Sequence, residues 1–145
     1  MNPSTHATSG TDRRPAHQLS GDVLVFRLGD EIEQLRQDLG RSSGQRSAKT
    51  LVKTGNLRVT LVVLEANATL EPEAHGGQAT VQVLDGGLRI QTDGNVRELG
   101  SGELVILERN LREPIQAVQR SAFLITVVWP EGAGAWSQEA AAGRL

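Results

Sequence analysis

Apolar residues alternate with polar ones over most of the sequence between Thr50 and Trp129, and this period of two constrains the fold more than any other feature. Such alternation is typical of β-strands that bury one face. Turn-forming groups separate the alternating runs, among them Asp85-Gly86-Gly87 and Asp93-Gly94-Asn95. The pattern predicts strands at Thr50–Lys53, Leu57–Leu64, Ala79–Leu84, Leu88–Thr92, Val96–Leu99, Leu104–Leu107, Ile115–Val118 and Ala122–Trp129.

These runs are short and closely spaced, and no helical pattern separates them. A parallel sheet of the Rossmann type needs a helix between successive strands, so that class is excluded. We therefore expect an all-β antiparallel barrel or sandwich. Three strand arginines, Arg58, Arg89 and Arg97, are expected on the solvated faces because arginine is rarely buried.

The sequence before the alternating region predicts a short strand and a helix. Val23–Phe26 is an apolar run that fits a first strand. Asp30 suits the N-cap of a short amphipathic helix, and Gly40 suits its C-terminal end. A single apolar face of this helix would carry Ile32, Leu35 and Leu39.

The length of 145 residues fits one domain with a substantial core. We place this domain at residues 21–130. Residues 1–20 are almost devoid of apolar side chains and are expected to form a disordered tail. Residues 131–145 are rich in glycine and alanine and are expected to form a flexible tail, in which Trp136 covers a neighbouring or partner surface.

Composition excludes several classes of function. The chain has no cysteine, which rules out thiolate metal sites, disulfides and cysteine nucleophiles. The net charge of -2 and the 3% aromatic content argue against nucleic acid as a partner. No apolar run is long enough for a membrane span, and no signal-peptide pattern opens the sequence, so we expect a cytoplasmic protein without a membrane partner.

One stretch, Asn67–Gly86, contains an isolated histidine between the predicted strands. It reads Asn-Ala-Thr-Leu-Glu-Pro-Glu-Ala-His-Gly-Gly-Gln-Ala-Thr-Val-Gln-Val-Leu-Asp-Gly. Its spacing resembles the first motif of the cupin family, G-x5-H-x-H-x3-E-x6-G. The match places Glu73 and His75 at the two histidines and Ala79 at the glutamate, and it ends on Gly86.

The second cupin motif, G-x5-P-x-G-x2-H-x3-N, fits from Gly102 without insertion. It places Glu108 at the proline, Asn110 at the glycine, Glu113 at the histidine and Ala117 at the asparagine. The resemblance covers about half of the chain. It implies a cupin-type jelly-roll β-barrel, whereas most of the residues that bind metal in the family are replaced here.

What the resemblance implies about the site is a ligand pocket in the barrel centred on His75. Glu73 and Glu113 would join it, and Val81 and Val83 would line it from the strand that begins near Ala79. Glu73, His75 and Glu113 could ligate a divalent metal such as Fe, Mn or Zn, or the metal site could be empty. Each of the three also fits a structural role: Glu73 as a solvated loop carboxylate, His75 as a pocket histidine bound to a carbonyl, and Glu113 as the partner of an arginine.

Three functional hypotheses follow. The first is a small cupin that binds a small polar ligand in the barrel, with a degenerate or empty metal site and no established catalysis. The alternative is an enzyme, a metal-dependent cupin of dioxygenase or isomerase type that uses Glu73, His75 and Glu113. A metal-free enzyme with His75 as general base ranks below both. The third is a homodimer assembled through the apolar helix face, the N-terminal strand and Trp136, which is compatible with either of the others.

Overall fold

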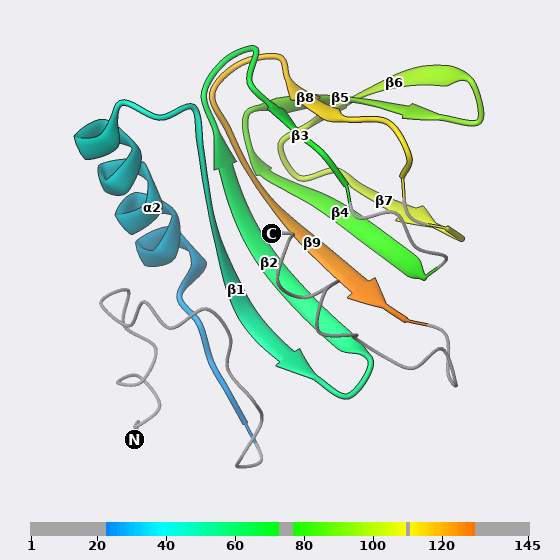
Figure 1. Cartoon of the computed structure of the whole chain (residues 1–145), viewed down its shortest axis with the longest axis horizontal. Coiled ribbons are helices and arrows are strands. Elements are labelled where there is room, and N and C mark those ends of the chain that lie inside the picture. The colour runs from blue at the N-terminus through cyan, green and yellow to red at the C-terminus, as the bar shows by residue number, and fades with distance from the viewer. Residues whose placement is uncertain (1–22, 73–76, 110, 130–145) are drawn as a thin grey trace.

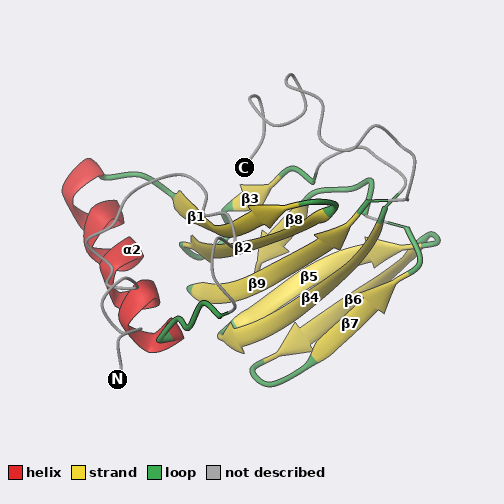
Figure 2. Ribbon diagram, turned by 90° about the horizontal axis from the view of Figure 1, so that it is seen from below, coloured by secondary structure: helices red, strands yellow, loops and turns green. Residues whose placement is uncertain are grey.

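A computed structural model of the chain describes residues 23–72, 77–109 and 111–129. These residues form one helix and two antiparallel sheets that together enclose a core (Figures 1 and 2). The predicted all-β architecture with one N-terminal helix is confirmed. The helix is α2 (Leu28–Ser42), and the nine described strands follow it: β1 (Arg46–Thr54), β2 (Leu57–Leu64), β3 (Thr69–Leu70), β4 (Gln78–Asp85), β5 (Gly87–Thr92), β6 (Asn95–Gly100), β7 (Leu104–Leu107), β8 (Ile115–Ala117) and β9 (Ser121–Val128).

The strands divide into a five-stranded sheet and a four-stranded sheet. We call the first sheet A, with the order β1-β2-β9-β4-β7, and the second sheet B, with the order β3-β8-β5-β6. Strands distant in sequence pair at the centre of sheet A, where β9 lies between β2 and β4. In this order β7 ends sheet A and β6 ends sheet B. The two-residue strand β3 pairs with β8 and was not predicted, because two residues are too few to show a period.

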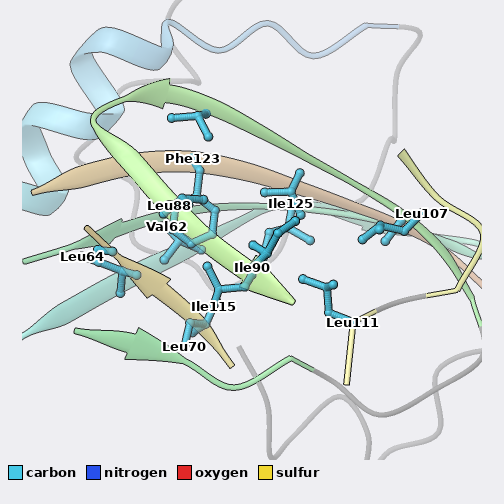
Figure 3. Close-up of a cluster of buried hydrophobic side chains, with 14 of the residues drawn as sticks. Val62, Leu64, Leu70, Leu88, Ile90, Leu107, Leu111, Ile115, Phe123 and Ile125 are labelled. Carbon is cyan, nitrogen blue, oxygen red and sulfur yellow. The ribbon is translucent and has the colours of Figure 1, made fainter. Parts of the chain in front are cut away.

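The main core lies between the two sheets. Phe123 and Val62 of sheet A face Leu88, Ile90 and Ile115 of sheet B, and each of these side chains is at most 1% exposed (Figure 3). On β4 the burial alternates along the strand, with Ala79, Val81 and Val83 turned inward as the period of two requires. The alternation in the sequence therefore predicts correctly which residues of β4 face the core.

A second, smaller core lies on the other face of sheet A, under α2. Leu35 and Leu39 of the helix pack against Leu61 and Val63 of β2, and Ile32 is half-buried against the same cluster. The helix packs mainly on β1 and β2 (Figure 1), and Ala122 of β9 belongs to the same cluster. Its predicted apolar face is thus used within the chain's own core.

The helix extends beyond the predicted bounds at both ends. Its N-cap is Arg27, whose carbonyl accepts a hydrogen bond from Glu31 N at 3.1 Å, so Asp30 lies in the first turn instead of capping it. An acidic residue in the first turn is favourable because of the helix dipole. At the other end Gly40 remains helical, and Ser43 provides the left-handed C-cap with φ 58°.

The prediction of a strand at Val23–Phe26 was wrong. The segment pairs with no strand among the described residues. Val23 and Val25 are exposed while Leu24 and Phe26 are half-buried, and Phe26 packs against the helix–sheet cluster. The segment therefore keeps the side-chain alternation of a strand but belongs to neither sheet of the described residues. No helix of the described residues is long and apolar enough to cross a membrane.

Candidate functional site: a cleft beside β6 and β7

A cleft of about 950 Å³ lies beside the last strand of each sheet. Its walls come from the end of β5, the β5–β6 turn, β6, β7 and the segment that follows β7. The lining residues are Gln91, Thr92, Asp93, Gly94, Arg97, Leu99, Leu104, Val105, Ile106, Leu107, Glu108, Arg109, Leu111, Arg112 and Glu113. Residues up to 22 positions apart in sequence, from Gln91 to Glu113, thus form one concave surface.

The floor of the cleft is apolar. Leu107 and Leu111 belong to the main core, and Leu99 and Val105 pack against it from β6 and β7. Because alternate residues of β7 point to opposite faces, Val105 and Leu107 face inward while Ile106 faces outward and is 73% exposed. Figure 3 shows Leu107 and Leu111 at one end of the main core, next to Ile90 and Ile125.

The rim of the cleft is charged. Arg97, Arg109 and Arg112 line it together with Glu108 and Glu113, and all five side chains are exposed. Arg97 Nε donates a hydrogen bond to Thr92 Oγ1 at 2.9 Å, which holds this guanidinium over the β5–β6 hairpin. A ligand with an apolar body and polar groups of either sign would find partners here.

The structure brings one predicted site residue to the cleft. Glu113 is exposed and lines it beside Arg112. Val81 and Val83 are 1% and 0% exposed, lie in the packed core between the sheets, and do not line the cleft. Glu73 and His75 lie outside the described residues, so the relation of the cleft to a pocket centred on His75 stays a prediction.

Within residues 23–72, 77–109 and 111–129, no three histidine, aspartate or glutamate side chains gather as a metal site would require. The motif position of the metal-binding glutamate is Ala79, which is 2% exposed and part of the main core. An alanine there supplies no ligand atom. Among described residues, Glu113 is therefore the sole member of the predicted ligand set.

One buried charge on the inner face was missed by sequence reasoning. Arg58 is 3% exposed, and it alternates along β2 with Thr60 and Val62 on the face turned toward sheet B. Arg58 pairs with Val127 of β9, and Val127 pairs on its other side with Ala79 of β4. The expectation of a solvated Arg58 was wrong, whereas Arg89 and Arg97 are exposed as expected. The alternation with Val62 and Leu64 was the signal that could have placed it.

Three of the positions that match motif glycines lie within the described residues and share an uncommon backbone conformation, whereas Asn110 lies outside them. Asn67, Gly86 and Gly102 have φ values of 69°, 94° and 87°. A Cβ atom at Gly86 would lie 2.3 Å from the carbonyl oxygen of Arg120, so only glycine fits there. Asparagine is among the few other residues that adopt a left-handed conformation readily, which explains its presence at position 67. The motif spacing therefore corresponds to real turns of the chain.

No protein-family model and no curated protein matches the sequence. The fold, in contrast, has many counterparts among solved structures. A conserved protein of unknown function from Streptococcus pyogenes matches with a TM-score of 0.55 at 25% identity, over 61% of this chain and 77% of that one. A cupin superfamily protein from Desulfitobacterium hafniense matches with a TM-score of 0.56 at 15% identity, over 60% and 80% of the two chains.

A larger protein also contains this architecture. A mutant of salicylate 1,2-dioxygenase from Pseudoaminobacter salicylatoxidans matches with a TM-score of 0.61 at 15% identity. The match covers 71% of this chain but only 34% of the dioxygenase chain. Identities this low carry the fold and not the activity.

Proposed function

Because the chain has the fold of the cupin superfamily, we propose that it is a small cupin that binds a small molecule in the cleft beside β6 and β7. The ligand would have an apolar body and at least one polar or charged group. The observation that carries this proposal is the cleft of about 950 Å³, with an apolar floor and a charged rim. Small-molecule sites are typically concave, mostly apolar, and furnished with a few polar groups that fix orientation.

The floor and the rim would have separate roles in recognition. Leu99, Val105 and Leu111 would remove the apolar part of the ligand from water, which is the main source of affinity. Arg97 and Arg112 would attract an anionic group, and Glu113 a cationic or hydrogen-donating one. Catalysis is no part of the proposal.

The proposal is tested with a dye whose chemistry fits the cleft. We expect 8-anilinonaphthalene-1-sulfonate, an apolar body with one anionic group, to bind the native protein saturably at one site. A Leu99→Trp variant would fill the cleft from β6 and weaken this binding at least about tenfold, a change equivalent to 1.4 kcal/mol. A Val118→Trp variant is the matched control, because Val118 is 40% exposed and does not line the cleft.

Native mass spectrometry of the untreated protein complements the dye. A retained small molecule that the dye displaces would identify the natural ligand class. Dye binding that is unsaturable, or equal in the Leu99→Trp and Val118→Trp variants, would refute binding in this cleft.

A further inference from the structure

Among the strand positions that face inward beside the cleft, Arg97 carries the one ionisable side chain that the structure describes. Arg97 of β6 pairs with Ile90 of β5, which is 1% exposed and belongs to the main core. Paired residues of neighbouring strands point to the same face of a sheet. Arg97 therefore lies on the inner face of sheet B, at the inward position adjacent to Leu99 of the cleft floor. The inward positions of β7 across the cleft, Val105 and Leu107, are apolar.

A hydrogen bond determines how the Arg97 guanidinium is presented. The acceptor of its Nε is Thr92 Oγ1 at 2.9 Å, and Thr92 is the next inward position of β5 after Ile90. This contact uses one of the five N–H donors of the guanidinium and leaves the two terminal amino groups, Nη1 and Nη2, for another acceptor. No carboxylate of the residues that the structure describes forms an ion pair with Arg97.

The other charges beside the cleft offset one another. Four of them come in consecutive pairs of opposite sign, which are Glu108 with Arg109 and Arg112 with Glu113. Opposite charges at neighbouring positions largely cancel in the field that a ligand experiences. Asp93 lies in the turn at the tip of the β5–β6 hairpin, beyond the last strand pair of Thr92 and Asn95. The charge that accompanies the apolar floor is therefore the positive charge of Arg97.

We infer that the ligand of this cleft is an organic acid, whose carboxylate is held end-on by Nη1 and Nη2 of Arg97 while its apolar body lies on the floor. The inference rests on the proposed binding function and names the chemical class of the ligand. Arginine stays protonated and carboxylates are ionised at neutral pH, so the two groups attract each other there.

The geometry of the guanidinium makes the recognition specific. Two parallel N–H···O bonds from Nη1 and Nη2 match the two oxygens of a carboxylate. A neutral amide of the same shape presents one oxygen and one NH2 group, and this NH2 group would face another donor. Thr92 acts as a positioning residue, because it holds the guanidinium through Nε and makes no contact with the carboxylate itself.

Competition between an acid and its neutral amide tests the inference. The reporter is N-phenyl-1-naphthylamine, which has the aromatic body of 8-anilinonaphthalene-1-sulfonate without the sulfonate. We expect 1-naphthoate to displace this dye from the wild-type protein at about fivefold lower concentration than 1-naphthamide, a modest preference because solvent screens an exposed guanidinium. Equal displacement by the acid and the amide would overturn the inference. Stronger displacement by the cation 1-naphthylmethylammonium would overturn it as well.

Three variants show whether the preference comes from Arg97 and its orientation. Arg97→Gln should bring the displacement concentrations of acid and amide to within about twofold of each other, because the fork and its charge are lost. Arg97→Lys keeps the charge without the fork, and Thr92→Val keeps the fork without its anchor, so each should retain only part of the preference. The ratio of the two concentrations cancels any change in the affinity of the dye.

The matched control is Arg89→Gln. Arg89 pairs with Glu98 in the strand pair next to that of Arg97, but on the outer face of sheet B, so this variant removes the same charge outside the cleft. It should keep the wild-type preference for the acid. An Arg97→Gln variant that keeps the full preference, or an Arg89→Gln variant that loses it to the same degree, would overturn the inference.

The neutral dye separates failure of this inference from failure of the proposed function. Saturable dye binding without a preference for the acid overturns the carboxylate assignment alone and leaves the proposed ligand site standing. A wild-type chain without saturable dye binding overturns the proposed function and this inference together. The comparison of acid and amide uses the unmodified chain, so it decides the matter even where a variant fails to fold.

Discussion

Lys49 Nζ lies 2.9 Å from Glu31 Oε1, and the two side chains are only 7% and 1% exposed. The contact joins the first turn of α2 to β1 inside the smaller core. Glu31 Oε2 is buried as well and has no hydrogen-bond partner among the residues that the structure describes. The attachment of the helix to the sheet thus combines leucine packing with one buried ion pair that is only partly satisfied.

Removal of one partner of this pair should destabilise the protein strongly. Glu31→Ala leaves the Lys49 ammonium buried without a counter-charge, and we expect a loss of about 3–5 kcal/mol in the free energy of unfolding. The double variant Glu31→Leu with Lys49→Met should recover most of that loss, because two apolar groups then replace two desolvated charges. Urea denaturation measures all three proteins.

The matched control is the exposed pair of Arg89 and Glu98, with side chains 43% and 59% exposed. Glu98→Ala should cost about 1 kcal/mol or less, because solvent screens this pair. Equal losses for Glu31→Ala and Glu98→Ala would contradict the distinction between buried and exposed pairs.

Gly86 should not tolerate alanine. Its φ of 94° is unfavourable for a side chain, and a Cβ atom would lie 2.3 Å from the Arg120 carbonyl oxygen. We expect Gly86→Ala to destabilise by about 2 kcal/mol or more, from the conformation and the overlap together. Gly94→Ala separates the two effects, since Gly94 has φ 79° with no atom within 4 Å of the added Cβ. Its loss should be about 1–2 kcal/mol. Thermal melting that ranks Gly94→Ala as the more harmful change would refute the steric argument.

Replacement of Asn67 by glycine and replacement by alanine should have different effects on stability. Its φ is 69°, its side chain is exposed, and its backbone N–H donates to the Ala117 carbonyl at 2.8 Å. Asn67→Gly keeps this geometry without strain and should leave stability nearly unchanged. Asn67→Ala should lose about 1 kcal/mol, because alanine adopts the left-handed conformation less readily. Chemical denaturation of the two variants measures this difference. Equal stability of the two variants would contradict the prediction and would show that the backbone at position 67 leaves the left-handed conformation without cost.

Ligand binding in the cleft should be independent of metal. The described residues contain no three-ligand group, and the floor of the cleft is apolar. Treatment with EDTA is therefore expected to leave dye affinity within about twofold of the untreated value, a change of about 0.4 kcal/mol or less. A large loss of affinity that Mn(II), Fe(II) or Zn(II) restores, and that His75→Ala or Glu113→Ala reproduces, would instead support the metal-dependent alternative. Glu108→Ala is the control, since Glu108 shares the rim but lies outside the predicted ligand set.

The sequence predicted the fold well because local and tertiary requirements agree along the strands. Val81 and Val83 alternate with Thr80 and Gln82, and the structure buries the valines as the period requires. The same rule fails where tertiary contacts decide. Val23–Phe26 has the composition of a strand, yet no edge of either sheet pairs with it among the described residues.

The candidate site was harder to predict than the fold. The cleft joins Leu99 on β6 to Leu111 after β7, and its existence depends on how the edges of two sheets lie, which no local pattern records. Glu113 was found through motif spacing. Arg58 was misassigned because arginine is rarely buried, and that general tendency was given more weight than its place in the alternation of β2.

The left-handed turns at Asn67, Gly86 and Gly102 show that the motif positions have two different roles. One kind shapes the backbone and must be kept for the barrel to close. The other kind supplies ligand atoms, and Ala79 in the packed core shows that this fold forms without one of them. During evolution a barrel of this design could lose one chemistry and acquire another while remaining folded at every step. In such a barrel the backbone turns would remain recognisable after the residues that carried the original reaction had been replaced.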